Sequence, residues 1–179
     1  QDEIQKKEEN KVEKWNLKNR IELRDIAYHY PDSNKLVLSD INFSINKGET
    51  IALIGSSGAG KTTLADILLG LLQPVKGTIL VDGKDIYDNM DAWHRMLGYI
   101  PQTIYLSDDT IRNNIAFGIV EEDIDDDAII DALKKAQLYD FVQTLDKGLD
   151  TFVGDRGVRL SGGQRQRIGI ARALYYNPE

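Results

Sequence analysis

The chain has 179 residues, a formal net charge of −7, no cysteine and 41% hydrophobic residues. This size and composition allow one hydrophobic core with a subdomain, and the absence of cysteine excludes disulfide bonds. The negative charge argues against a nucleic-acid-binding surface. Because no apolar run approaches 18 residues and no signal peptide opens the chain, we expect any membrane span to lie outside it.

The first 19 residues are polar and rich in charge, with no glycine or proline. They are typical of a solvated linker or a helix end, and a disordered tail or an expression remnant is an equally open alternative. Asp82 and Gly83 follow an apolar run and predict a hairpin turn. The strands that we expect lie near residues 21–30, 36–45, 50–54, 78–81 and 98–100.

A glycine-rich loop, GSSGAGKT at residues 55–62, follows the apolar run 51–54. Apolar residues spaced i, i+3, i+4 and i+7 come directly after it and predict a helix. The glycines let consecutive N–H groups approach phosphate oxygens, and the helix N-terminus adds a positive field. Lys61 would reach the outer phosphates and the Thr62 hydroxyl would bind Mg²⁺. The alternative is a turn that only packs a helix on a strand.

A second glycine-rich string, LSGGQRQR at residues 160–167, opens another predicted helix. Ser161 is a favourable N-cap, so a simple helix start is one interpretation. However, Gly162 and Gly163 destabilise a first turn relative to alanine, which a structural cap would not require. Their presence indicates that a phosphate of another molecule approaches bare N–H groups there.

Between the two strings the pattern becomes helical from about residue 109. Acidic residues crowd the start of a predicted helix that runs from about 121 to Thr144, where they suit the helix dipole. A metal site is the weaker alternative for this cluster, because it has no turn glycine or calcium-loop spacing. We interpret Arg165, Arg167 and Arg172 as solvated or paired helix charges.

Together, GSSGAGKT and LSGGQRQR resemble the Walker A loop and the signature motif of ATP-binding cassette (ABC) transporters, over about residues 20–179. We call residues 55–62 the phosphate-binding loop and residues 160–167 the signature segment. Tyr30 matches the aromatic residue that stacks on adenine, although a core aromatic is the alternative, as it is for Tyr28. Gln102 matches the Q-loop glutamine, which touches Mg²⁺ and senses the membrane partner.

Other segments resemble the exporter-type members of that family. TFVGDRG at 151–157 is similar to their X-loop, with Asp155 where glutamate is usual. LSDDTIRNNIAFG at 106–118 is similar to a segment near the helices that couple to the membrane domain. The run 104–107 loosely resembles flippases of lipids or lipid-linked oligosaccharides.

In the family, a strand carrying an aspartate and a catalytic glutamate follows the signature helix, and a switch histidine comes later. No such residues follow the signature segment here, and both His29 and His94 precede it. The resemblance implies that residues 1–179 bind nucleotide but hydrolyse it poorly, whereas the whole domain is an ATPase. A missing strand would also leave apolar surface uncovered, so we expect weak stability or a partner that supplies the strand.

The fold class that the resemblance implies is α/β, a P-loop NTPase core with an antiparallel β subdomain and a helical, signature-bearing subdomain. The expected domains are a linker at 1–19 from an upstream membrane domain and a partial nucleotide-binding domain at 20–179. The helical subdomain spans about 103–176, and the C-terminal part of the domain is missing.

The resemblance also implies ATP and Mg²⁺ as cofactors, a head-to-tail dimer with a second nucleotide-binding domain, and a transmembrane domain outside this chain. It implies ATP-driven export or flipping at the cytoplasmic face of a membrane, the bacterial inner membrane. Two alternatives stay open, a soluble ABC-type ATPase without membrane spans and a non-catalytic interaction module. The catalytic candidates are Lys61 and Gln102, and the metal candidates are Thr62 and Gln102. The cofactor-binding candidates are Tyr30, Gly55, Ser56, Ser57, Gly58, Ala59, Gly60, Lys61, Thr62, Thr63, Gln102, Ser161, Gly162, Gly163 and Gln164.

Overall fold

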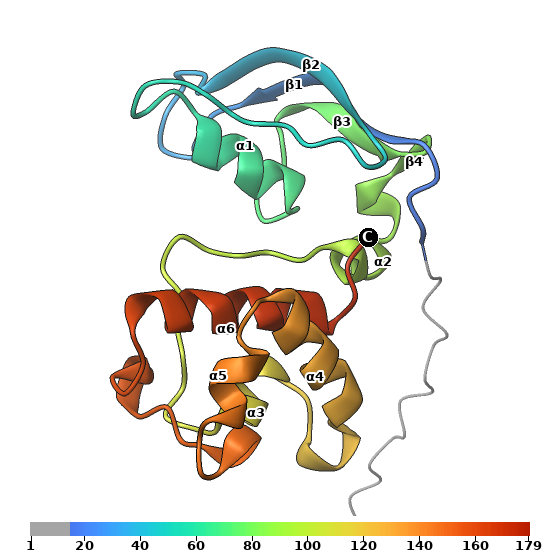
Figure 1. Ribbon diagram of the computed structural model, residues 1–179. Coiled ribbons are helices and arrows are strands. Elements are labelled where there is room, and N and C mark those ends of the chain that lie inside the picture. Colours follow the sequence, from blue (N-terminus) through green and yellow to red (C-terminus); the bar gives the residue numbers. More distant parts are fainter. Residues whose placement is uncertain (1–14) are drawn as a thin grey trace, which may run out of the picture. The chain divides into compact units, whose positions relative to one another are not determined.

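The computed structural model describes residues 15–179 (Figure 1). These residues form two compact units, and the boundary between them in the sequence lies between Met96 and Leu97. The expected α/β class is confirmed, with an antiparallel sheet in the first unit and helices in the second. The first unit contains β1 (Arg20–Tyr28), β2 (Leu38–Asn46), α1 (Lys61–Leu68), β3 (Lys76–Val81), β4 (Lys84–Asp85), η1 (Ile86–Asp88) and α2 (Met90–Met96).

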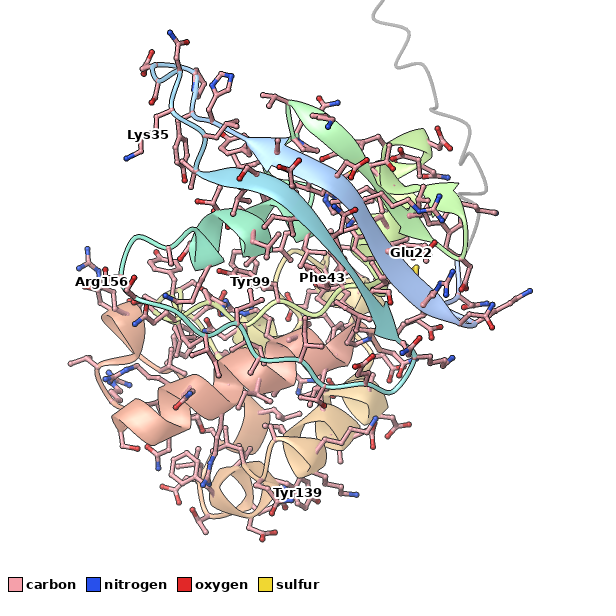
Figure 2. The ribbon with its side chains drawn as sticks, turned by 90° about the horizontal axis from the view of Figure 1, so that it is seen from above. Glu22, Lys35, Phe43, Tyr99, Tyr139 and Arg156 are labelled. Carbon is pink, nitrogen blue, oxygen red and sulfur yellow. The ribbon has the colours of Figure 1, made fainter. Side chains whose placement is uncertain are left out.

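The sheet of the first unit has the strand order β2-β1-β3-β4, and each neighbouring pair is antiparallel. Its register places Leu23 of β1 between Phe43 of β2 and Ile79 of β3. On the same strand, Glu22 forms ion pairs with Arg20 and Arg24, which lie two residues away on its own face (Figure 2). The alternation therefore separates a buried apolar row from a charged row.

A bulge interrupts β1 where it pairs with β3. Asp25 has a φ of 51°, and the register between the strands shifts between Arg24 and Ala27. Gly77 lies opposite with a φ of 94°, and a Cβ there would stand 2.3 Å from the Arg24 carbonyl oxygen. Only glycine fits this close backbone approach.

Helix α1 lies against one face of the sheet and buries Thr63, Leu64 and Ile67 (Figure 1). Its carboxyl end is closed by α2, because the Trp93 indole N–H donates to the carbonyl oxygen of Leu68 at 3.0 Å. This bond satisfies one of the carbonyls that a helix end leaves without a partner. The carboxyl end of α1 is thus held against α2.

The first unit also holds the chain that leads into β1. The Asp82 carboxylate, in the β3–β4 turn, accepts N–H bonds from Lys18, Asn19 and Arg20 at 2.6, 2.8 and 3.0 Å. These bonds, that from Lys18 foremost, lower the pKa of Asp82 from its ordinary value. Trp15 is buried just before them. Most of the predicted linker, residues 1–14, lies outside the described residues.

The second unit is built on a long helix that begins in the signature segment. This helix is α6 (Gly162–Tyr175), and it packs on α4 (Asp126–Lys135) and α3 (Ile111–Ile115). The core joins Ile168 and Ala171 of α6 to Leu133 of α4 and to Ile111 and Ile115 of α3. No helix among residues 15–179 is long and apolar enough to cross a bilayer. The elements of this unit are α3 (Ile111–Ile115), η2 (Glu121–Asp123), α4 (Asp126–Lys135), α5 (Tyr139–Gln143), η3 (Gly148–Asp150), η4 (Asp155–Gly157) and α6 (Gly162–Tyr175).

Two predicted strands do not form. Residues 50–54 and 98–100 pair with no strand of the described chain, and the structure leaves their apolar side chains exposed, with Ile54 at 94%. An apolar run predicts a buried strand only where a neighbour can take its N–H and C=O groups. The exposed side chains agree with the expectation that apolar surface stays uncovered.

The helix boundaries differ in two places from the prediction. The first helix ends at Leu68, so that Leu71, expected on its apolar face, lies beyond it and is exposed. The helix expected to run to Thr144 is two helices, because Gln137 is left-handed, with a φ of 56°. In contrast, the hairpin turn at residues 82–83 and the helix that starts after Ser161 are confirmed.

Candidate functional site

The phosphate-binding loop leads directly into α1 and leaves the start of that helix without a side-chain cap. Gly58 and Gly60 have φ angles of 80° and 88°, and Gly60 occupies the N-cap position in a left-handed conformation. A Cβ at Gly60 would stand 2.8 Å from the Leu38 side chain and 3.3 Å from the Val37 carbonyl oxygen. The loop therefore requires glycine here and presents first-turn N–H groups that no side chain occupies.

Lys61 is the first residue of α1, and its side chain folds back over the loop. Its ammonium donates to the carbonyl oxygens of Gly55 and Ser56 at 2.8 and 2.7 Å. The positive charge is thus held beside the uncapped helix start, where the helix dipole also favours an anion. An incoming anion would replace carbonyl oxygens as the acceptor of these N–H groups.

Tyr30 and Tyr28 have different surroundings, although the period-two pattern places them on the same face. β1 ends at Tyr28, which is buried, whereas Tyr30 lies beyond the strand and is 44% exposed. The two rings meet edge to face, with centroids 5.2 Å apart. The Tyr30 hydroxyl lies 3.0 Å from Oγ1 of Thr63. Tyr28 takes the core position, and Tyr30 extends to the start of α1.

The signature segment forms a capped helix start. The Ser161 hydroxyl accepts the Gln164 N–H at 3.2 Å, while the Gln164 side chain accepts the Ser161 N–H at 2.7 Å. This capping box leaves the N–H groups of Gly162 and Gly163 at an exposed surface. A Cβ at Gly163 would meet nothing within 4 Å, and one at Gly162 only the Arg165 guanidinium at 3.9 Å. Packing within the described chain does not require these glycines.

Arg165 and Arg172 of α6 are half-buried and bind backbone carbonyls, which differs from the predicted solvated or paired charges, whereas Arg167 is exposed, as predicted. Arg165 donates to the Leu160 carbonyl at 2.7 Å and so fixes the turn before the helix. Arg167 donates to the Gln137 carbonyl at 3.0 Å. The start of α6 is thus held by its own side chains.

In the preceding X-loop-like segment, Arg156 is exposed and left-handed, with a φ of 51° (Figure 2).

Arg172 connects α6 to the chain that follows Gln102. It donates to the Asn114 carbonyl at 2.7 Å and to the Tyr105 carbonyl at 3.0 Å, and it lies over the Phe117 ring at 5.0 Å. Burial lowers the pKa of this guanidinium from its ordinary value. The sequence did not predict this contact, because the carbonyl acceptors lie far from Arg172 in the chain and no local pattern around Arg172 indicates them.

Asn114, the other member of this contact, is fully buried on α3. Its side-chain amide donates to the carbonyls of Ser107 and Thr110 at 3.1 and 2.9 Å and accepts the Ser107 N–H at 3.0 Å. A buried amide with these partners fixes the loop between residues 107 and 110. A polar residue in an apolar helical pattern was the only sequence signal of this role.

The structure brings together one group of predicted site residues in each unit. In the first unit, Tyr30 contacts the helix that begins at the phosphate-binding loop. In the second, residues 161–164 form one helix start, and Gln102 lies in an exposed bend. Close packing of Ile104 on Gly169, where a Cβ would stand 2.5 Å from it, links the chain after Gln102 to the middle of α6.

Comparisons with known proteins agree with this geometry. The chain is 43% identical over 162 residues to an ATP-dependent lipid A-core flippase of Bordetella avium, covering 90% of this chain and 27% of that protein. It is 42% identical over 169 residues to a sophorolipid transporter of Starmerella bombicola, covering 89% of this chain and 13% of the transporter. The chain thus spans less than a third of the length of these relatives.

A solved structure of a bacterial Atm1-family ABC exporter with ATP bound superimposes with a TM-score of 0.82 at 35% identity. The match covers 94% of this chain and 29% of the exporter. In addition, the family model described as ABC transporter matches residues 38–179, which include both glycine-rich strings. The chain therefore belongs to the ABC transporter family.

Proposed function

We propose that this chain is an ATP-binding domain that powers export or flipping of a substrate across a membrane, through ATP binding and hydrolysis in a head-to-tail dimer. The observation that carries the proposal is the start of α1, where a glycine loop, a lysine and uncapped N–H groups converge. This combination fits the phosphates of a nucleotide. The relative solved with ATP bound supports the same choice of ligand.

The donor set also fits Mg²⁺ beside the phosphates. The Thr62 side chain is exposed at the start of α1, next to Lys61, and a hydroxyl oxygen is a ligand that Mg²⁺ accepts. Gln102 offers a second oxygen ligand by its match to the Q-loop glutamine. The bound ion would neutralise phosphate charge, and Lys61 would hold the outer phosphates. We propose Tyr30 as the adenine platform and residues 55–63 as the phosphate contacts, with Thr63 contributing through its backbone N–H and not through its hydroxyl.

The signature segment of a second copy or a related domain would close the far side of the same nucleotide. The support is the exposure of Gly162 and Gly163, which no packing contact of the described chain requires. Their N–H groups, with the Ser161 hydroxyl and Gln164, form a helix start at which an anion is favoured. Each nucleotide would therefore bridge two domains.

We further propose that the protein acts at the cytoplasmic face of a membrane, the inner membrane of a bacterium, beside a transmembrane domain outside this chain. The names of two relatives, a lipid A-core flippase and a sophorolipid transporter, favour a lipid or glycolipid as the substrate. Because nothing after the signature segment matches the polarising glutamate of the family, we expect residues 1–179 alone to bind ATP and to turn it over slowly.

The test uses the protein expressed from its full reading frame and reconstituted in lipid vesicles. ATP hydrolysis should require Mg²⁺. It should fall at least 100-fold in Lys61→Ala, because the variant lacks the positive charge that binds the outer phosphates. Lys147→Ala, which changes an exposed lysine of the second unit far from the loop in sequence, serves as the control and should retain activity. Equal rates for Lys61→Ala and the unmodified protein would contradict the proposal and favour a non-catalytic module.

A further inference from the structure

A hydrogen bond links the proposed adenine platform to the proposed phosphate site. The Tyr30 hydroxyl and Oγ1 of Thr63 lie 3.0 Å apart, and they come from positions 33 residues apart in the chain. We infer that Thr63 is a positioning residue, whose hydroxyl sets the orientation of the Tyr30 ring relative to the first turn of α1. It would thereby hold the surface on which the base stacks at a fixed distance from the phosphate donors. This inference rests on the proposed nucleotide binding.

Thr63 is suited to this role because its side chain is buried and β-branched. It is 5% exposed, on the face of α1 that also buries Leu64 and Ile67. A β-branched threonine in a helix has few χ1 rotamers, and burial restricts them further. Its neighbour Thr62 is exposed, so that the two hydroxyls are directed to different surroundings. Thr62 is therefore available to a metal ion, while Thr63 faces the protein.

The Tyr30 ring, in contrast, needs support from outside its own strand. β1 ends two residues earlier, and the side chain of Tyr30 is 44% exposed. Its backbone is fixed, since its carbonyl oxygen accepts the Ser33 N–H at 3.0 Å and a bond from the His29 ring at 2.9 Å. Its ring touches the Tyr28 ring edge to face. The hydroxyl bond to Thr63 fixes the far end of the ring.

Two fixed ends give the ring one orientation, which leaves its exposed side as a flat surface. A base can stack on such a surface whatever its identity, so that the position of the surface decides whether base and phosphates are held together. The bond to α1 ties that position to the helix that carries the phosphate donors. Loss of the bond should lower the fraction of molecules in which the Tyr30 ring has the orientation that stacks on a base. The apparent affinity for the nucleotide should fall by the same factor.

The experiment measures binding of MgATP and of inorganic tripolyphosphate to the protein expressed from its full reading frame. Thr63→Val and Tyr30→Phe each remove one hydroxyl with little change of shape. Each should weaken MgATP binding about 2- to 10-fold, the range for one net hydrogen bond. The double variant should be no weaker than either single variant. Tripolyphosphate, which has no base, should bind Thr63→Val and the unmodified protein equally.

Two controls complete the design. Thr63→Ser keeps the hydroxyl and should restore most of the MgATP affinity. Thr144→Val removes a threonine hydroxyl bonded at 2.6 Å to the Phe141 carbonyl in the other unit and should bind MgATP normally. Melting curves for each variant should show that it folds.

The inference is overturned if Thr63→Val weakens tripolyphosphate as much as MgATP, since the hydroxyl would then serve the phosphates. It is equally overturned if the two single effects multiply in the double variant, or if Thr63→Val binds MgATP normally. Lys61→Ala separates this failure from failure of the proposed function. If the unmodified protein binds both ligands and Lys61→Ala loses both, nucleotide binding stands on its own. If the unmodified protein binds neither ligand, both proposals fail.

Discussion

Replacing Gly163 by alanine should make the protein more stable and less active. A Cβ at this position meets nothing within 4 Å, and the backbone needs no left-handed φ. Alanine is favoured over glycine in a helix by up to about 1 kcal/mol. For a chain of this size, that free energy corresponds to a rise in melting temperature of at most about 4 °C.

The loss of activity has a separate cause. If a phosphate of a partner-bound nucleotide approaches the Gly163 N–H, a methyl group on the same residue holds it away. A hydrogen bond to a charged group contributes about 1.5–3 kcal/mol, so that its loss should slow ATP hydrolysis and weaken nucleotide-dependent pairing by about 10- to 100-fold. ATP binding by a single copy should change little, because Lys61 and its loop are intact.

The assay compares melting temperature, ATP hydrolysis and ATP-dependent association of Gly163→Ala with those of Gln166→Ala. Gln166 is exposed on the same helix, beyond the helix start, so this control raises helix propensity without touching the open N–H groups. A stabilised Gly163→Ala protein with normal hydrolysis and association would refute the reasoning. A destabilised one would show that packing requires the glycine.

Two further predictions concern stability. Arg172→Ala should lower the free energy of unfolding by about 2–4 kcal/mol, because it removes the guanidinium bonds to the carbonyls of Asn114 and Tyr105 and the contact with the Phe117 ring. In contrast, Arg167→Ala loses one exposed bond and should lower it by less than about 1 kcal/mol. Urea unfolding measures both. The Asp82 carboxylate, whose pKa lies below its ordinary value of 3.8, should stabilise the fold above that pH. This contribution should be lost as the pH falls through the lowered pKa, and Asp82→Asn should remove this part of the pH dependence, which urea unfolding at several pH values measures.

Local chemistry made some parts of this fold predictable. The Asp82-Gly83 pair needs left-handed backbone at both residues, and the structure has φ angles of 49° and 86° there. Likewise, Ser161 followed by Gln164 is a capping-box pattern, and it forms as such. Each of these features depends on residues a few positions apart, so that the sequence contains the whole interaction.

The features that were mispredicted depend on distant partners. The run 51–54 has the composition of a buried strand, yet strand formation needs a neighbouring strand that the described chain does not provide. The period-two pattern placed Tyr28 and Tyr30 on the same face, because the pattern alone does not show that β1 ends at Tyr28. In the same way, the acceptors of Arg172 lie 58 and 67 residues away from it.

The two glycine-rich helix starts differ in the charge that they present, and this difference sets an order of events. The start of α1 combines uncapped N–H groups with the formal charge of Lys61. In contrast, the start of α6 satisfies two N–H groups with its own capping box, and the guanidinium of Arg165 beside it donates to the Leu160 carbonyl. A helix start with uncapped N–H groups and a lysine beside them attracts a polyphosphate more strongly than one whose own side chains occupy two N–H groups. The phosphate-binding loop should therefore take up the nucleotide first, and the signature segment should then associate with a nucleotide that is already bound.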